Sequence, residues 1–256
     1  MNDLQKRVLG WLQSTGFPLE MAAADAFRKA GFDTRQSSQY ADLEAMKGRE
    51  IDVVARDPDH LGAINIVFAI ECKSSSRPWV VLKSDHALAA FNRVHAFSLW
   101  SHKGREVLGQ KIDELGTLMP YLMRGSEGGY GLRQALADGG GDAAFTAAVN
   151  VIKASFGLIH PENCGSEGTA SFAFPVIVID TPLFECSLSE NGELILVEVE
   201  ESEFLFACHI PNYVTTCIKV VKKEHLLSFA TKSKVLAASL RSDLSQYEIE
   251  IMAAMS

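Results

Sequence analysis

The chain has 256 residues, 47% of them hydrophobic, and a formal net charge of −8. This composition is that of a globular protein with enough apolar surface for a proper core, built as one large domain or two small ones. The acidic balance argues against coating of DNA or of an acidic membrane by the whole surface, but it is compatible with a local basic groove.

No segment of the sequence has the character of a membrane span or of a secretion signal. The longest apolar stretches, residues 64–70 and 172–179, fall well short of the ~20 residues that a spanning helix needs, and residues 1–16 lack a signal-peptide core. The five cysteines are odd in number and widely spaced, and no zinc-site spacing joins them. We therefore expect a soluble, cytoplasmic protein with reduced thiols.

The first third of the chain predicts two helices and three strands. Apolar side chains at helical spacing indicate helices over residues 3–13 and 18–31. Strand character follows at residues 32–40 and 49–56, and then in the stretch 64–76, which begins as a nearly unbroken apolar run. Helix, strand, strand and strand in close order suggest a meander packed under the second helix.

The rest of the chain changes character from Ser84. Helices are predicted over residues 88–99, 107–123 and 143–158, the last capped by Asp142, with glycine-rich joints at 125–131 and 139–141. Strands are expected at 172–180, 184–188, 193–199, 203–209 and 215–221, and a closing helix at 226–240. Pro175 indicates an edge strand or a strand start, and Asn191–Gly192 a hairpin turn.

Neither repeats nor a low-complexity linker divide the sequence. We therefore expect a single elaborated α/β domain over residues 1–256. Its parts would be a core motif region at 18–83, a helical insertion at 84–160, and the remaining strands with the closing helix at 172–256.

The end of the third strand carries the chemistry of interest. Glu71 and Lys73 stand two residues apart at the end of a buried run, so their side chains share one face while Cys72 points to the other. Burying charges is costly unless they are paired or bind a metal. The pair therefore marks either a buried ion pair or an active site.

Asp52 provides a second carboxylate in the same region. It interrupts the apolar strand that precedes the Glu71 strand, and a turn lies between them, so the two carboxylates can lie side by side at one end of a sheet. Two such groups suit Mg²⁺, which can polarise a phosphodiester oxygen and acidify a bound water. Lys73 could orient that water or offset developing charge. The set predicts a phosphodiester hydrolase.

These motifs resemble a known family. Glu20 on a helix, Gly31–Phe32, Ser37 or Ser38, Glu50–Ile51–Asp52 and Glu71–Cys72–Lys73 are similar, in that order, to the PD-(D/E)xK nuclease superfamily, closest to its Mrr-like and Holliday-junction-resolvase-like branches. The match covers residues 18–76, with Ile51 in place of the proline of the family name. The resemblance implies a restriction-endonuclease-like mixed β-sheet flanked by helices, extended here by a helical insertion and C-terminal strands.

The resemblance also implies roles for individual residues. Asp52 and Glu71 would be ligands of Mg²⁺, with Mn²⁺ as a substitute, Lys73 the catalytic lysine, and Glu20 a supporting carboxylate. The activity would be that of an endonuclease acting on nucleic acid, with DNA favoured over RNA as the substrate, in restriction, repair or phage defence. A homodimer is compatible with the resemblance.

Residues near the motif are candidates for contact with substrate. They share hydroxyl groups or positive charge and are Ser38, Ser74, Ser75, Arg77 and Lys83. Trp79 could stack on a base, but core packing is favoured for it. Two alternatives stay open: a nuclease-fold module that binds nucleic acid or protein without turnover, and a purely structural ion pair of Lys73.

Overall fold

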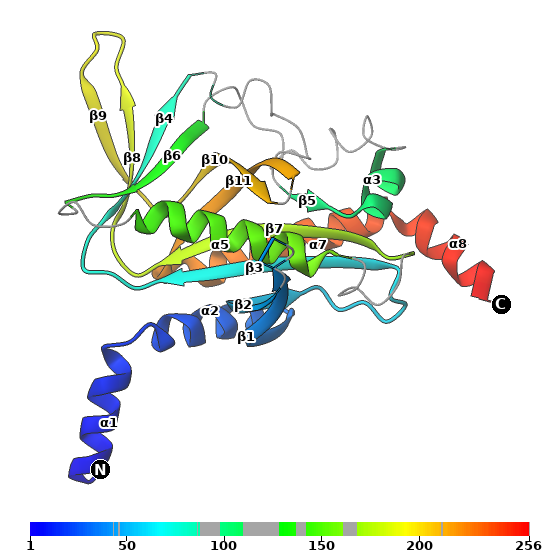
Figure 1. The fold of residues 1–256 in the computed structure, drawn as a ribbon, viewed down its shortest axis with the longest axis horizontal. Helices are drawn as coiled ribbons and strands as arrows, with labels where there is room; N and C mark the ends of the chain where they lie inside the picture. The colour runs from blue at the N-terminus through cyan, green and yellow to red at the C-terminus, as the bar shows by residue number, and fades with distance from the viewer. Residues whose placement is uncertain are drawn as a thin grey trace.

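The computed structural model describes residues 1–42, 44–45, 47–85, 87, 98–109, 128–136, 142–160, 168–210 and 212–255. The helices are α1 (Asp3–Gln13), α2 (Phe17–Lys29), α3 (His102–Gly109), α5 (Ala143–Leu158), η3 (Lys223–His225), α7 (Leu226–Asp243) and α8 (Ser245–Met255) (Figure 1). The strands are β1 (Asp33–Asp42), β2 (Lys47–Arg56), β3 (Ile64–Lys73), β4 (Trp79–Ser84), β5 (Leu99–Trp100), β6 (Gly128–Gln134), β7 (Ala170–Ile179), β8 (Leu183–Leu188), β9 (Leu194–Val199), β10 (Glu201–Ile210) and β11 (Asn212–Lys222).

One mixed sheet of eleven strands joins all parts of the described chain. Its order is β1-β2-β3-β7-β11-β10-β6-β4-β8-β9, with β5 paired to β7 outside this path. The first three strands form the predicted antiparallel meander, and β7, which matches the strand predicted at 172–180, pairs with β3 in parallel. The prediction of a mixed α/β protein with a large sheet flanked by helices is confirmed.

Strand β3 lies at the centre of the core and is covered on both faces. Ile66 and Phe68 pack in the apolar cluster that includes α2 and α7, whereas Val67 and Ala69 pack in the cluster that includes α5. Alternation along the strand therefore sends successive side chains to opposite helical layers. A strand that is buried on both faces needs the continuous apolar run that the sequence provides at this position.

Helix α5 sits very close to the sheet because of Gly157. A Cβ at this position would lie 2.8 Å from the carbonyl oxygen of Ala41 and 2.9 Å from the ring of Tyr40. Real Cβ atoms do not come this close, so only glycine allows the last turn of α5 to rest on β1.

Several predicted elements are wrong. Residues 128–131, predicted as part of a glycine-rich joint, belong to β6, and Leu99 begins the short strand β5 instead of ending a helix. Residues 79–84 form β4, which was not predicted as a strand. The segment 84–160 is therefore not purely helical. The predicted helix at 107–123 overlaps α3 up to Gly109, and its remaining residues, like 88–97 of the preceding helix, lie outside the described residues.

Pro175 does not mark an edge or a strand start, because β7 lies inside the sheet. On one side β7 pairs with β3 throughout. On its other side it pairs with β5 at Phe172 and Ala173 and with β11 from Val176 onward. Pro175 falls between these two stretches, where its missing N–H removes no ladder hydrogen bond on that side.

Other predictions are confirmed. Helix α1 begins with a capping box at Asn2, although none of its residues is buried and it extends away from the sheet (Figure 1). Asp142 caps α5 by accepting a hydrogen bond of 2.9 Å from the Phe145 N–H. The β8–β9 hairpin turns at Gly192, which has a φ of 79°. No helix within the described ranges is long and apolar enough to cross a membrane.

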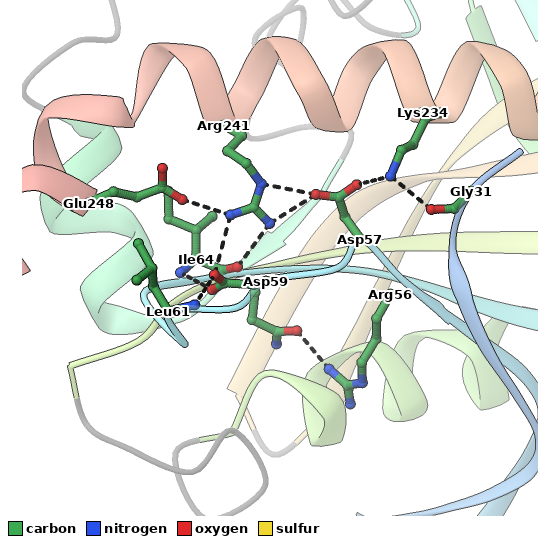
Figure 2. A network of polar contacts seen from close by, with 10 residues as sticks. Gly31, Arg56, Asp57, Asp59, Leu61, Ile64, Lys234, Arg241 and Glu248 are labelled. Atoms are coloured by element: carbon green, nitrogen blue, oxygen red, sulfur yellow. Dashed lines mark hydrogen bonds and ion pairs between the residues drawn. The ribbon is translucent and has the colours of Figure 1, made fainter. Parts of the chain in front are cut away.

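A charge network fastens helix α7 to the loop that follows β2 (Figure 2). The buried carboxylate of Asp57 accepts hydrogen bonds from Lys234 at 2.6 Å and from the Arg241 Nε and Nη2 atoms at 3.0 and 2.9 Å. Arg241 is also paired with Glu248 at 2.7 Å and with Asp59 at 3.7 Å. Because Asp57 balances two cations, it holds α7 over the α2 face of the sheet.

Removing the Asp57 carboxylate should destabilise the fold. Asp57→Ala leaves two cations without their buried partner, and we expect it to lower the free energy of unfolding by about 3 kcal/mol. Urea denaturation measures this change. The matched control is Asp25→Ala, since Asp25 pairs with Lys29 on an exposed surface and its loss should leave the free energy of unfolding nearly unchanged. Equal effects of the two substitutions would contradict the role of Asp57.

Candidate active site

Asp52 and Glu71 occupy opposing positions on neighbouring strands. The antiparallel register of β2 and β3 ends at the pair Val53–Ile70, and continuing it by one position sets Asp52 across from Glu71. The charge of Glu71 also raises the pKa of Asp52, as expected for two carboxylates that approach at one end of the meander.

Strand β2 changes faces at Asp52. Ile51 packs on the α5 side of the sheet, whereas Val53, two residues later, packs on the α2 side. In a regular strand these two side chains would share a face. The partner strand is irregular at the same point, because Ser37 lies across from Asp52 and has a φ of 49°, a left-handed conformation that is costly outside glycine.

The side chain of Asp52 takes the place of a ladder hydrogen bond. Its Oδ2 accepts the backbone N–H of Cys72 at 2.6 Å, so that the carboxylate reaches toward the end of β3. Burial and then the charge of Glu71 raise the pKa of Asp52 to about 6, with a smaller contribution from Glu20. The local backbone thus holds a carboxylate where a second negative charge makes its ionisation unfavourable.

Glu71 is nearly inaccessible, with 4% of its surface exposed, and it is compensated from two elements. Lys73 donates a hydrogen bond of 2.7 Å to Glu71 Oε1, and Asn150 of α5 donates one of 3.2 Å to the same atom. The shared face predicted for Glu71 and Lys73 is therefore confirmed. Cys72 packs against the cluster on the opposite face, where burial raises the pKa of its thiol well above the usual value.

Glu20 lies in the electrostatic field of this group. It stands in the first turn of α2, a position where the helix terminus favours a negative charge. Its pKa is nevertheless raised, first by burial and then by Glu50 and Glu71. Burial is the largest cause of this rise, and the contribution of Glu71 shows that Glu20 lies within the electrostatic field of the site.

Two of the candidate substrate hydroxyls bond within the protein. Ser74 Oγ donates to Asp180 Oδ2 at 2.5 Å, and Ser75 donates its backbone N–H to Asp180 Oδ1 at 3.0 Å. The Ser75 hydroxyl also accepts hydrogen bonds of 2.7 Å from Gln134 and 2.9 Å from the Arg77 N–H. These contacts make the segment after β3 a structured connection to the end of β7.

The three remaining predicted substrate contacts lie in different places. Arg77 belongs to the connection after β3, where its carbonyl oxygen accepts a hydrogen bond of 2.9 Å from the Thr181 hydroxyl. Lys83 forms an ion pair of 3.1 Å with Glu185 and lines a small polar cavity of about 150 Å³. Ser38 lies on β1, directly after Ser37, and pairs with Ile51 of β2. Trp79 is fully buried in the cluster of α5, which is the packing role favoured from the sequence.

Asn150 is the site residue that sequence reasoning missed. It sits in the middle of α5, a helix whose neighbouring positions are mostly apolar and buried. An amide on such a helix needs a polar partner. A single amide among the apolar positions of a helix can be recognised in the sequence and indicates a buried polar contact. Its partner cannot be recognised there, because it depends on how α5 packs over β3.

Asp52 and Glu71 are the two carboxylates that could hold a hard divalent cation with few protein ligands. Within the described part of the chain, Asp52 Oδ1 and Glu71 Oε2 accept no hydrogen bond, so each carboxylate keeps one oxygen available. No set of three or more His, Cys, Asp and Glu side chains in the described ranges is arranged to hold a metal. Two carboxylates completed by water are the arrangement that Mg²⁺ accepts.

Comparison with known proteins adds no relative. The chain matches no family model, no curated protein and no solved structure.

The raised pKa of Asp52 predicts a pH-dependent cost to stability. Unfolded aspartate has a pKa of about 3.9. The folded state therefore holds the proton more tightly, and the stabilisation present below the unfolded value is lost as the pH rises through about 6. In EDTA, Asp52→Asn should raise the free energy of unfolding by roughly 1–2 kcal/mol at pH 8, after allowance for solvent screening, and by much less at pH 4.

Urea denaturation of both proteins at the two pH values measures this difference. Asparagine can still accept the Cys72 N–H, so the substitution removes the charge and keeps the hydrogen bond. A variant that is less stable than the wild-type protein at pH 8 would contradict the electrostatic account of the site.

Proposed function

We propose that the chain is a Mg²⁺-dependent nuclease of the PD-(D/E)xK type, with a restriction-endonuclease-like core, that hydrolyses phosphodiester bonds of nucleic acid. The observation that carries the proposal is the register that sets Asp52 opposite Glu71, with Lys73 bonded to Glu71 at the end of a buried strand. Nothing in the packing of β3 requires three ionisable side chains there. A site that handles a metal and a phosphate does require them.

Each side chain has a distinct role in this proposal. Asp52 and Glu71 would hold the cation through the oxygens that make no hydrogen bond within the described chain. The bound metal supplies polarisation of the scissile phosphate and a more acidic water. Lys73 orients that water or offsets charge on the phosphate, and Glu20 supports the site as an outer carboxylate.

Asn150 acts as a positioning residue. Its amide fixes Glu71 Oε1 from the α5 side while Lys73 binds the same oxygen. The second oxygen is thereby directed away from both donors. Fixing a ligand from a second element is the usual way in which proteins orient carboxylates around a metal.

A second candidate is a module that keeps the fold but has no turnover. The close Lys73–Glu71 ion pair of 2.7 Å favours it, because a lysine that only neutralises a buried glutamate needs no substrate. Under this alternative the protein binds nucleic acid or a protein partner without cleaving it. Cleavage assays separate the two candidates.

The nuclease proposal predicts metal-dependent cleavage that depends on the site. Wild-type protein should cut DNA, or RNA, in Mg²⁺ or Mn²⁺ and not in EDTA. Glu71→Gln and Lys73→Met should each lower the cleavage rate at least about 100-fold, because each removes a charge that acts on the reacting phosphate. Labelled single-stranded, duplex and branched substrates resolved on denaturing gels provide the measurement.

The matched control is Lys29→Met, which removes an exposed lysine of α2 that pairs only with Asp25 within the described residues. This variant should cleave at the wild-type rate. Cleavage that persists equally in folded Glu71→Gln and Lys73→Met would rule out the site. Binding of nucleic acid without cleavage by any of the proteins would favour the inactive module.

A further inference from the structure

A groove of about 630 Å³ runs along the outer edge of the sheet beside the proposed site. Five consecutive residues of β1, 35–39, line it together with Val54 and Arg56 of β2 and Leu158 of α5. Ser37 is the residue that lies across from Asp52, so one part of the groove adjoins the carboxylates. The groove opens on the same side of the sheet as α5, which is also the side of Glu71 and Asn150.

The groove is locally basic in an acidic protein. Its lining contains Arg35 and Arg56 and no carboxylate, although the whole chain carries a net charge of −8. The other polar positions are two serines and two glutamines. Hydroxyl, amide and guanidinium groups are the donors that proteins use to contact phosphate and sugar oxygens.

The two arginines are spaced along the sheet surface. Arg35 of β1 pairs with Val54 of β2. Arg56 follows Val54 by two residues on β2 and shares its face of the sheet, so Arg35 and Arg56 are diagonal neighbours. Such neighbours are about 7–8 Å apart along the backbone, so the two long side chains can reach separate phosphates of one nucleic-acid strand. The spacing therefore suits the backbone of a single nucleic-acid strand lying along β1.

Arg35 and Arg56 differ in how they are held. Arg56, which is labelled in Figure 2, donates a hydrogen bond of 2.7 Å to Asn65 and is thus fixed in place. Arg35 is exposed and forms no ion pair or side-chain hydrogen bond with any described residue. Asp33 lies across from Arg56 in the register but is not part of the groove lining. An unpaired, exposed arginine next to a fixed one leaves a cation free for a phosphate.

We propose that this groove binds the phosphate backbone of the substrate strand and leads it to the Asp52–Glu71 site. The inference rests on the proposed function and specifies its substrate surface. Arg35 is a binding and positioning residue here, since it acts on the strand away from the reacting phosphate. Its loss should therefore weaken binding and raise KM while kcat stays close to the wild-type value.

The test is fluorescence anisotropy with a labelled 20-nucleotide single strand in EDTA, across a range of salt concentrations. Arg35→Ala should bind about threefold to tenfold more weakly at 50 mM salt, and the slope of log K against log salt should become shallower by roughly 0.7, the value for one lost contact to a single strand. Arg28→Ala, which removes an exposed arginine from α2, is the matched control and should leave both quantities unchanged. Arg35→Lys should keep most of the affinity.

The outcomes separate this inference from the nuclease proposal. If Arg35→Ala and Arg28→Ala bind alike, or if the wild-type protein does not bind the strand, the groove assignment is overturned. If Arg35→Ala binds weakly and the wild-type protein cleaves nothing in Mg²⁺ or Mn²⁺, the groove assignment stands and the nuclease proposal fails. Site-dependent cleavage with a KM unchanged in Arg35→Ala would support the nuclease and contradict the groove.

Discussion

The burial of Glu71 is the constraint on which the region around it depends. A carboxylate with 4% of its surface exposed at the end of an apolar strand needs hydrogen-bond donors to replace the water it has lost. Lys73 on the same strand and Asn150 on α5 provide them. A buried charge without a partner would cost several kcal/mol. The position of α5, set by the contact of Gly157 with β1, is therefore coupled to the charge at the end of β3.

Asp52 lowers the stability of the folded state and has no evident structural role that requires it. Its carboxylate lies opposite another carboxylate, replaces a ladder interaction and accompanies a backbone irregularity at Ser37 on the neighbouring strand. Burial and the charge of Glu71 both disfavour its ionised form. Unfavourable features that gather at one point are typical of sites kept for function, and a divalent cation is the simplest ligand that would relieve them.

Sequence reasoning reached the local parts of this arrangement. The apolar run of β3, the exceptional Asp52 and the shared face of Glu71 and Lys73 all follow from strand periodicity, and the meander places them together. The cap at Asp142 and the hairpin at Gly192 likewise follow from short-range rules.

Features that depend on distant pairing could not be read from the sequence. Residues 128–134 are rich in glycine and look like a joint, yet they form a strand because β4 and β10 provide its neighbours. Pro175 is tolerated inside the sheet only because β7 changes partners at that point. Asn150 and the groove of β1 depend in the same way on how α5 and β1 pack. Ser74 and Ser75 likewise bond to Asp180, which directly follows β7.

The central claim is that Asp52 and Glu71 share one divalent cation. Isothermal titration calorimetry of the wild-type protein with Mg²⁺ and Mn²⁺ at pH 7.5, beside Asp52→Asn and Glu71→Gln, tests it directly. The account predicts one bound ion per wild-type chain and loss of binding in both variants. Equal binding by all three proteins, or none by the wild-type protein, would contradict it.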